Sequence, residues 1–288
     1  MTNILVTGGN GQLGNCLKDL SEELSSQYNF IFKSSEELDI TDLSSLTSFF
    51  ELNNLNYCIN CAAYTNVDQA EDEIKQANLV NHKGVEYLAQ ICHANGTTLI
   101  HISTDFVFNG NKSLAYNETD LADPQNEYGL SKLLGEKAVK KHCKKHFIIR
   151  TSWLYSEYGT NFLITMLKLS KTRKKISVVA DQIGSPTYAR DLAEVIINHI
   201  IKNRSNSYGL YHFSNEGVAS WYDFAQAIFD ENSSVIELTP ITTKDYPTKA
   251  VRPSFSVLEK SKIKETFNIE ISHWRTSLKK VIQHYLIK

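Results

Sequence analysis

Thr7-Gly8-Gly9-Asn10-Gly11-Gln12-Leu13-Gly14 carries the strongest indication of fold in this chain of 288 residues. It follows a short apolar run, Ile4 to Val6, and precedes a segment with helical periodicity. The pattern predicts a strand, a tight turn and a helix, and in that context this glycine spacing is typical of a dinucleotide-binding loop. The glycines would allow the turn, the approach of a pyrophosphate and close helix packing. A plain glycine turn is the alternative.

Strand-like and helix-like segments alternate through the rest of the first half of the chain. The expected strands are 28–32, 57–63, 98–102 and 147–151, and the expected helices include 77–94 and 130–142. Each connection is long enough for a crossover, so the alternation predicts a doubly wound parallel sheet with helices on both faces. We therefore expect an α/β fold of the Rossmann type, with a smaller α/β substrate-binding domain at the carboxyl edge of the sheet.

The second half of the chain has a looser pattern. It contains four of the five prolines, which is typical of shaped loops. We expect residues 1–170 to form the dinucleotide-binding domain, with 188–212 returning to it. Residues 171–187 and 213–288 are expected to form the substrate-binding domain.

Composition narrows the functional classes. Thirty Lys and Arg against 32 Asp and Glu give a formal charge of −2, so no overall positive field is available for nucleic acid. The five cysteines are odd in number and mostly lie in apolar or periodic stretches, which indicates reduced thiols of a cytoplasmic protein. Cys58 and Cys61 have no second Cys or His pair nearby, so we expect no metal. No leader or membrane-spanning run is expected, and a homodimer is compatible with the sequence.

The end of the second expected strand bears on the choice of cofactor. A carboxylate there accepts a hydrogen bond from the ribose 2′-hydroxyl of NAD, whereas a cation tolerates the 2′-phosphate of NADP. Lys33, followed by two serines, favours NADPH and leaves NADH open. A merely solvated lysine is the alternative. Asp39 and Ile40 are expected to frame the adenine end.

Two pairs of polar residues suggest a reaction at a carbonyl group. Tyr128 and Lys132 lie four residues apart at the start of a predicted helix and therefore share one face. An ammonium near a phenol lowers its pKa, so we expect Tyr128 to donate a proton near neutral pH. Thr104 and Asp105 follow a strand at the ligand-binding edge, where a hydroxyl could donate to a carbonyl oxygen. A solvated Tyr–Lys pair and a simple strand-ending turn are the alternatives.

Taken together, these features resemble the extended short-chain dehydrogenase/reductases that act on nucleotide sugars. Further segments make the chain similar to the dTDP-4-dehydrorhamnose reductase family, from the start to about Lys260. These segments are Gly11-Gln12-Leu13-Gly14, Asp39-Ile40-Thr41-Asp42, Asn60-Cys61-Ala62-Ala63-Tyr64-Thr65-Asn66-Val67-Asp68, Ser103-Thr104-Asp105-Phe106-Val107-Phe108, Tyr128-Gly129-Leu130-Ser131-Lys132 with Gly135-Glu136, Arg150-Thr151-Ser152-Trp153, Asn161-Phe162, Asp181-Gln182-Ile183-Gly184-Ser185-Pro186-Thr187 and Arg252-Pro253-Ser254. Cys61 stands where the family usually has alanine, and the acidic residues for an interface metal are not matched.

The resemblance implies NADPH-dependent reduction of the C4 ketone of dTDP-4-dehydro-6-deoxy-L-mannose to dTDP-L-rhamnose, for surface polysaccharide. The catalytic residues implied are Thr104, Tyr128 and Lys132. The cofactor contacts expected are Gly8, Gly11, Gln12, Leu13, Lys33, Asp39, Ile40, Ala63, Tyr64, Thr65, Tyr128 and Lys132. The substrate contacts expected are Thr104, Asp105, Trp153 and Gln182.

Other activities are open. Phe106 occupies the position at which related 4,6-dehydratases carry a glutamate, and its ring cannot transfer a proton, which argues against dehydration. Another sugar-nucleotide reductase, an epimerase and a non-catalytic NADP-binding regulatory subunit are the alternatives.

Overall fold

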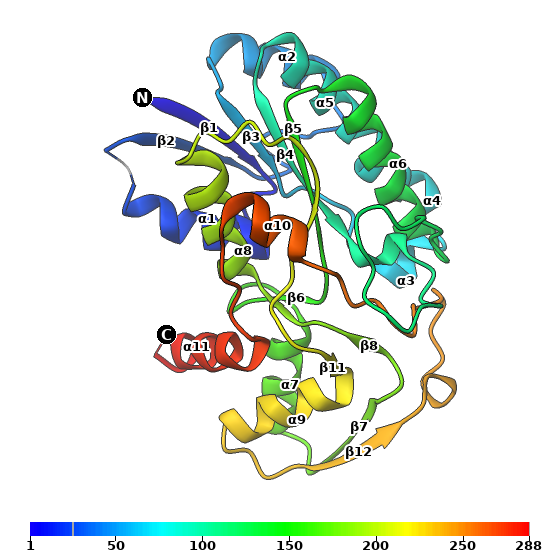
Figure 1. Ribbon diagram of the computed structural model, residues 1–288. Helices are drawn as coiled ribbons and strands as arrows, with labels where there is room; N and C mark the ends of the chain where they lie inside the picture. The colour runs from blue at the N-terminus through cyan, green and yellow to red at the C-terminus, as the bar shows by residue number, and fades with distance from the viewer. Residues whose placement is uncertain (25, 288) are drawn as a thin grey trace.

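A six-stranded sheet in the order β10-β5-β4-β3-β1-β2 forms the centre of the molecule (Figure 1). The computed structural model describes residues 1–24 and 26–287. The strands are β1 (Thr2–Thr7), β2 (Tyr28–Lys33), β3 (Tyr57–Asn60), β4 (Thr98–Thr104), β5 (His146–Thr151) and β10 (Gly209–His212). All neighbouring strands are parallel, so the predicted doubly wound α/β class is confirmed.

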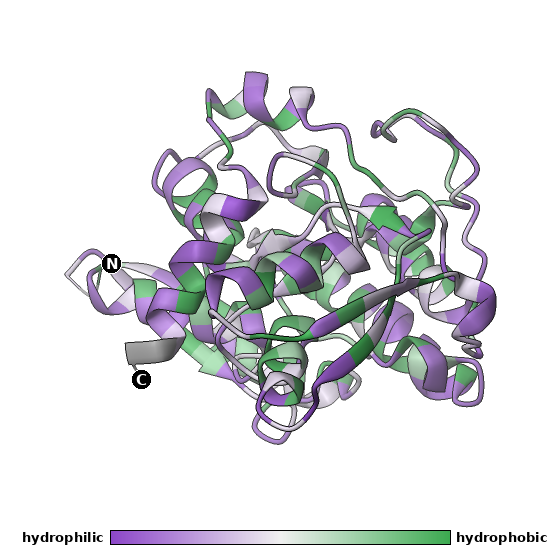
Figure 2. Ribbon diagram, turned by 90° about the horizontal axis from the view of Figure 1, so that it is seen from below, coloured by the Kyte–Doolittle hydropathy of each residue, from purple (hydrophilic) through white to green (hydrophobic). Residues whose placement is uncertain are grey.

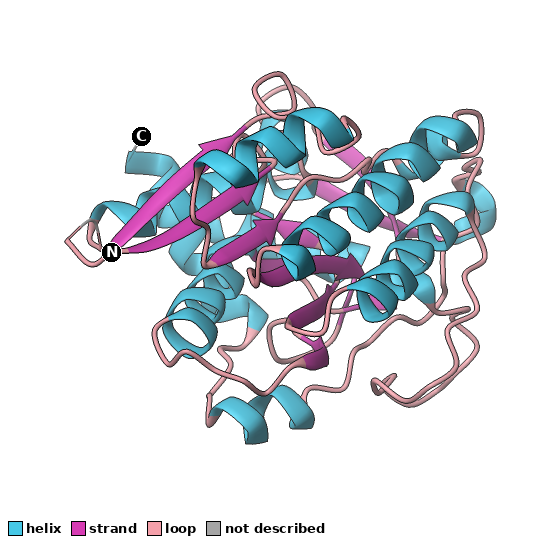
Figure 3. Ribbon diagram, turned by 90° about the horizontal axis from the view of Figure 1, so that it is seen from above, coloured by secondary structure: helices cyan, strands magenta, loops and turns pink. Residues whose placement is uncertain are grey.

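Helices cover both faces of this sheet (Figure 3). One face packs against α1 (Gln12–Glu22) and α8 (Ala189–Val195), and the other against α2 (Leu43–Leu52), α5 (Val85–Ala94) and α6 (Glu127–His142). Successive residues of a strand point to opposite faces. Ile100 and Ile149 therefore belong to the core under α1, whereas Leu99 and Ile148 belong to the core under α5.

Three short helical segments follow β3 and β4. They are α3 (Val67–Ala70), α4 (Ile74–Asn78) and the 3-10 turn Asp105–Val107. A π-helical segment, Leu79–Gly84, joins α4 to α5. The single helix expected over 77–94 is therefore interrupted, and the strand expected over 57–63 ends at Asn60.

The remaining elements pack as a smaller unit beneath the sheet in Figure 1. Its helices are α7 (Phe162–Ser170), α9 (Trp221–Glu231) and α11 (Trp274–Ile287). Its paired strands are β6 (Leu154–Tyr155) with β9 (Thr187–Tyr188), β7 (Lys175–Val179) with β12 (Glu237–Ile241), and β8 (Ile183–Gly184) with β11 (Ala219–Ser220). These elements share a separate core that includes Phe224 and Trp274.

Three elements from the second half of the chain pack with the sheet and not with the smaller unit. The α8 helix and β10 lie with the sheet, and α10 (Ser261–Phe267) also packs there through Ile263 and Phe267. In contrast, α7 packs against α9 in the smaller core. In both units the helices carry hydrophilic and hydrophobic residues, and hydrophilic residues dominate the outer loops (Figure 2). This pattern is expected for helices with one buried side.

Candidate active site

The glycine-rich loop connects β1 to α1 and leaves a backbone cradle at the start of the helix. Gly8 has a φ of +66°, and a Cβ there would lie 2.6 Å from the amide nitrogen of Ala62. A Cβ on Gly14 would lie 2.6 Å from the carbonyl oxygen of Gly9. Gly11 caps the helix without a side-chain hydrogen bond, so the first-turn amides can bind a phosphate. The loop therefore fits the pyrophosphate of a dinucleotide.

Gln12 and Leu13 lie in this first turn, but their side chains have other contacts. The Leu13 side chain is buried in the core under α1. The Gln12 Oε1 atom accepts hydrogen bonds from Asn161 Nδ2 at 2.9 Å and from Ser156 Oγ at 3.1 Å. The Gln12 side chain ties the loop to the smaller unit, and the contact of the Gln12 and Leu13 backbone amides with a phosphate stays a prediction.

Lys33 ends β2 beside a carboxylate that the sequence pattern missed. The Lys33 Nζ atom lies 3.9 Å from Glu37 Oε1 and 5.8 Å from the centroid of the Phe49 ring. Glu37 Oε2 accepts a hydrogen bond from the Ser34 amide at 2.8 Å, and this bond holds the pKa of Glu37 below its usual range. The strand end therefore presents one cation and one anion, and the preference of Lys33 for a 2′-phosphate stays a prediction.

Asp39 and Ile40 lie in the turn before α2. Asp39 Oδ1 accepts hydrogen bonds from the amide of Thr41 at 2.8 Å and from its hydroxyl at 2.9 Å. Ile40 is buried and lies against Gly84. Asp39 thus stabilises its own turn, and its contact with an adenine stays a prediction.

The loop after β3 holds three predicted cofactor contacts: Ala63, Tyr64 and Thr65. Asn81 fixes this loop, because its Oδ1 accepts from the Tyr64 amide at 2.9 Å and its Nδ2 donates to the Tyr64 carbonyl at 3.0 Å. The same Nδ2 donates to Ser131 Oγ on α6 at 3.0 Å. Asn81 is fully buried, so it couples the loop to α6. An asparagine on the buried side of a predicted helix was the signal that could have found it.

The three predicted catalytic residues meet at the carboxyl end of β4. Thr104 is the last residue of β4, and its hydroxyl lies near enough to the phenol of Tyr128, in the first turn of α6, to lower the pKa of that phenol. One turn later, the Nζ atom of Lys132 donates to the carbonyl oxygen of Ile102 at 2.6 Å. A hydroxyl, a phenol and an ammonium are therefore gathered at one edge of the sheet.

The pKa values at this edge differ from the expectation. Burial raises the pKa of Tyr128 to about 12, Thr104 acts against this shift, and the charge of Asp105 adds to it. Burial lowers the pKa of Lys132 to about 8, and the charge of Glu136 opposes that shift. The predicted lowering of the Tyr128 pKa is therefore wrong, because the desolvation of the phenol outweighs its neighbours.

Asp105 follows Thr104 and is almost completely buried. Its Oδ1 accepts from the Thr104 hydroxyl at 3.1 Å, while its Oδ2 has no hydrogen-bond partner within the described part of the chain. Burial raises the pKa of Asp105 to about 6, and the nearby Ser256 and Thr104 hydroxyls oppose this shift. A buried carboxylate oxygen without a donor is suited to accept one from a ligand hydroxyl.

Trp153 follows β5 in a left-handed backbone conformation with a φ of +47°. Its ring stacks on that of Trp221, with centroids 3.6 Å apart and planes 6° apart. Gly184 also lies close to this ring, because a Cβ there would lie 2.6 Å from Trp153 Cε2. Gln182 accepts from Trp221 Nε1 at 3.2 Å and donates to Thr243 Oγ1 at 3.1 Å. The structure thus brings Trp153 and Gln182 together through Trp221, which the sequence pattern missed.

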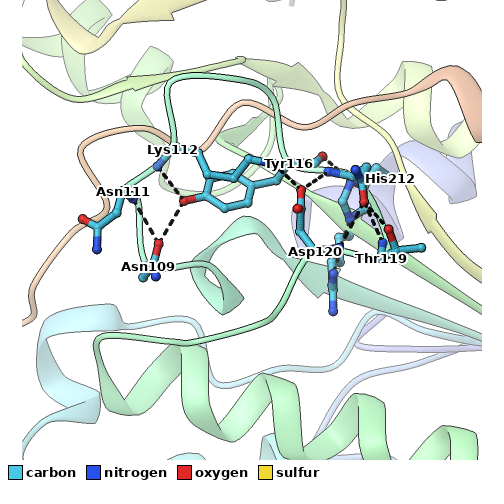
Figure 4. Close-up of polar contacts among 9 residues, drawn as sticks. Asn109, Asn111, Lys112, Tyr116, Thr119, Asp120 and His212 are labelled. Carbon is cyan, nitrogen blue, oxygen red and sulfur yellow. Dashed lines mark hydrogen bonds and ion pairs between the residues drawn. The ribbon is translucent and has the colours of Figure 1, made fainter.

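The loop between β4 and α6 is fixed by its own polar contacts (Figure 4). The Tyr116 hydroxyl donates to Asn109 Oδ1 at 3.0 Å, and Lys112 Nζ lies 2.6 Å from Asp120 Oδ2. His212 Nδ1 lies 3.0 Å from the Tyr116 carbonyl, and burial lowers the pKa of His212 to about 3. A neutral His212 therefore donates to the loop and anchors it to β10.

Residues 1–24 and 26–287 have neither a metal-binding cluster nor a membrane-spanning helix. In those residues no group of three or more His, Cys, Asp or Glu side chains could hold a metal ion, and no helix is long and apolar enough to cross a bilayer. All five cysteines are free, with Cys61 partly buried and the others buried. Burial raises the pKa of Cys92 well above its usual value, which makes that thiol a poor nucleophile.

The chain is similar to known proteins along its whole length. The family model described as the RmlD substrate binding domain matches residues 1–287. The dTDP-4-dehydrorhamnose reductase of Aggregatibacter actinomycetemcomitans is 45% identical, and the alignment covers 98% of each chain. The spore coat polysaccharide biosynthesis protein SpsK of Bacillus subtilis is 42% identical, again with 98% of each chain covered. The crystal structure of dTDP-4-dehydrorhamnose reductase from Bacillus anthracis in complex with NADP superposes with a TM-score of 0.94 at 40% identity, covering 99% of this chain and 100% of that one.

Proposed function

Because this chain belongs to the RmlD substrate binding domain family, whose relatives include dTDP-4-dehydrorhamnose reductases, we propose that it reduces the C4 ketone of dTDP-4-dehydro-6-deoxy-L-mannose. The product is dTDP-L-rhamnose, and its use is the synthesis of surface polysaccharide. NADPH is the proposed reductant, since a relative at 40% identity is solved with NADP. The enzyme is thus an oxidoreductase of nucleotide-sugar metabolism.

The contact between Thr104 and Tyr128, one helical turn before Lys132, is the observation that carries this proposal. When bound, NADPH supplies the hydride that reduces C4. The Tyr128 phenol gives its proton to the carbonyl oxygen as that oxygen gains charge, and the Thr104 hydroxyl orients the same oxygen. Lys132 holds the nicotinamide ribose and stabilises the phenolate that remains.

The raised pKa of Tyr128 suits reduction. With a pKa of about 12, the phenol carries its proton at neutral pH and is ready to donate it. Negative charge on the phenolate after transfer is stabilised by the Lys132 ammonium, which is buried at the same edge. The direction of the shift therefore favours a residue that acts as a general acid.

The substrate would lie between the sheet edge and the smaller unit. We assign the unpartnered Oδ2 of Asp105 to a sugar hydroxyl, because a buried carboxylate gains most from a new donor. We assign the partly exposed face of Trp153 to the sugar ring, with Gln182 holding Trp221 behind it. Residues of one chain supply all of these contacts, so the proposal does not depend on a homodimer.

We also propose the domain division and the location of the enzyme. The sheet unit would bind NADPH, with 188–212 included, and the smaller unit would bind the dTDP-sugar. The packing of α8 and β10 on the sheet supports this division, and the packing of α7 on α9 favours moving α7 to the smaller unit. A cytoplasmic location is proposed from the free thiols.

The test is NADPH oxidation with dTDP-4-dehydro-6-deoxy-L-mannose, run in parallel with UDP-linked 4-keto sugars. We expect turnover with the dTDP-sugar, formation of dTDP-L-rhamnose and much slower turnover with the UDP-sugars. Equal turnover with both nucleotides would contradict the proposed substrate. NADPH binding without turnover of either sugar would favour the regulatory-subunit alternative.

A further inference from the structure

A buried carboxylate lies one helical turn beyond Lys132 and is bonded to two strands of the sheet. Glu136 Oε1 accepts hydrogen bonds from Ser103 Oγ at 2.6 Å and from Arg150 Nε at 2.8 Å. Glu136 Oε2 accepts from Arg150 Nη2 at 2.7 Å. The exposed fraction is 0% for Glu136, and both of its carboxylate oxygens already accept hydrogen bonds from Ser103 or Arg150, so neither oxygen is free for a ligand. The role of this cluster is therefore internal.

Three consecutive residues of β4 contact three consecutive turns of α6. In strand order, the contacts are Ile102 with Lys132, Ser103 with Glu136, and Thr104 with Tyr128. Side chains four residues apart lie on one face of a helix, about 6 Å apart along its axis. A shift or rotation of α6 would move Tyr128 and Lys132 together, and the Glu136 bonds oppose that movement.

The two strands that bind Glu136 are the ones beside the proposed substrate. Ser103 precedes Thr104 on β4, and Arg150 pairs with Ser103 in the parallel register. Two parallel N–H to oxygen bonds from a guanidinium fix the carboxylate in angle as well as in distance. Glu136 thus sets the position of α6 relative to Thr104.

The Glu136 carboxylate also affects the charge state of Lys132. Glu136 raises the pKa of Lys132 against the effect of burial. Cys61, from the loop after β3, also raises the pKa of Lys132, and Lys132 in turn lowers the pKa of His101 on β4. Burial holds the pKa of His101 well below its usual value, so this histidine is neutral. Glu136 is therefore the anion that favours the ammonium.

Stability alone does not account for this ion pair. Removing two charges from water costs about as much as their attraction returns, and apolar replacements of similar volume are often neutral. We propose that Glu136 is a positioning residue for the reduction, which fixes α6 against β4 and β5 and supplies the negative charge beside Lys132. This inference rests on the proposed function, because it assigns Glu136 a role in the reaction of Tyr128 and Lys132.

The test must separate positioning from folding. Glu136→Gln keeps the shape of the side chain but leaves the buried Arg150 charge without its partner, so a loss of activity in this variant would not distinguish misplacement from misfolding. The double variant Glu136→Met with Arg150→Met removes both charges and keeps the packing volume. Glu86→Gln is the matched control, because Glu86 is a glutamate of α5 paired with Lys83 at 2.9 Å, away from the proposed site.

The double variant is expected to keep its melting temperature close to that of the wild type. Its kcat should fall about ten- to a hundredfold with little change in the KM of the sugar, because the reacting groups are misplaced while the sugar contacts remain. The basic limb of its pH profile should move down by about one pH unit, because Lys132 loses the anion that favours its protonated form. Glu86→Gln should leave kcat and the pH profile unchanged.

The pKa of Lys132 gives a readout that does not need activity. It is measured by NMR on lysine-labelled protein, with Lys132→Met for assignment, and should fall in the double variant and not in Glu86→Gln. A folded double variant with unchanged kcat and an unchanged Lys132 pKa would overturn the inference. If the wild type does not reduce the sugar, the proposed function is wrong. The NMR comparison does not depend on activity, so it still tests the interaction between Glu136 and Lys132.

Discussion

Tyr128 is the residue on which the proposed reaction depends most. Its phenol contacts Thr104, its pKa is raised to about 12, and it lies one turn before Lys132. The phenol is thus protonated and lies near the Thr104 hydroxyl, which is proposed to orient the substrate carbonyl.

Tyr128→Phe should reduce kcat by about 10² to 10⁴, the usual contribution of a general acid. NADPH affinity should stay near the wild-type value, because the phosphate loop and Lys132 are unchanged. Thr104→Val serves as the comparison. Its kcat should fall less than that of Tyr128→Phe, because the substitution removes an orienting hydrogen bond and keeps the proton donor. Steady-state kinetics and a fluorescence titration with NADPH check both points. Equal losses in the two variants would contradict these roles.

Asp105 predicts a pH dependence of substrate binding. Its raised pKa of about 6 means that the carboxylate takes up a proton as the pH falls through 6. Protonation removes an acceptor from the sugar hydroxyl, so the KM of the sugar should rise below pH 6. Asp105→Asn should have a raised KM at pH 7 and a nearly flat KM between pH 5 and 7. A wild-type KM that is constant over this range would disprove the assignment.

Residue identities were predictable from the sequence, but their environments were not. The spacing of Tyr128 and Lys132 indicates a shared helical face, and the structure places both beside Thr104. Spacing contains no information on burial, so the direction predicted for the pKa shift of Tyr128 was wrong. The contact of Lys33 with Glu37 was missed for a related reason, because it depends on how the chain turns after β2.

Elements rather than single residues shape the expected sugar pocket. Trp153 comes from the end of β5, Trp221 from the start of α9, and Gly184 from β8. Their stack joins the sheet unit to the smaller unit, and the left-handed conformation of Trp153 costs roughly 1 to 3 kcal/mol. The surrounding contacts must therefore hold this ring in place.

Trp153→Phe should keep a stacked aromatic ring and lose the indole N–H. We expect a nearly unchanged melting temperature, normal NADPH binding and a clearly raised KM of the dTDP-sugar. Trp221→Phe is the matched variant, which should raise the KM less if Trp221 only supports Trp153. A large fall in melting temperature with a normal KM would assign Trp153 to packing and leave the sugar to Asp105.

Secondary structure was predicted best where periodicity is simple. The expected strand 147–151 differs from β5 by one residue, and the expected helix 130–142 begins three residues late because Asn126, not Leu130, caps α6. The π-helical segment Leu79–Gly84 was not predictable, since one inserted residue per turn leaves the apolar pattern almost intact. That segment positions Asn81, so the missed backbone and the missed site residue have one cause.

Contacts between the C-terminal half of the chain and the sheet unit help to hold the molecule together. Arg252 forms two hydrogen bonds with Asp68, at 2.7 and 3.1 Å, and the Ala250 amide donates to the same carboxylate at 3.1 Å. These contacts link a segment after β12 to α3, next to the loop after β3. The relative position of the two units therefore depends on residues 184 positions apart in sequence.

Asp68→Asn tests this link through pH. The hydrogen bond from Arg252 lowers the pKa of Asp68 below 3.8, so its contribution to folding is present above that pH and is lost as the pH falls through the folded value. Because Asp68 is partly exposed, the expected loss of unfolding free energy at pH 7 is only about 0.5 to 1 kcal/mol. Urea unfolding at pH 7 and near pH 3 measures it. If the difference in unfolding free energy between Asp68→Asn and the wild type is as large near pH 3 as at pH 7, this assignment is refuted.

In the proposed reaction, hydride from NADPH reaches C4 of a dTDP-sugar at the carboxyl end of β4, and Tyr128 protonates the carbonyl oxygen. The most direct measurement is transfer of deuterium from NADPH deuterated at nicotinamide C4, with the position in the sugar read by NMR. We predict one deuterium at sugar C4 in dTDP-L-rhamnose, one NADPH consumed per product, and a severe loss of transfer in Tyr128→Phe. Deuterium at another carbon, or conversion of the sugar without net NADPH consumption, as in an epimerase, would contradict the account.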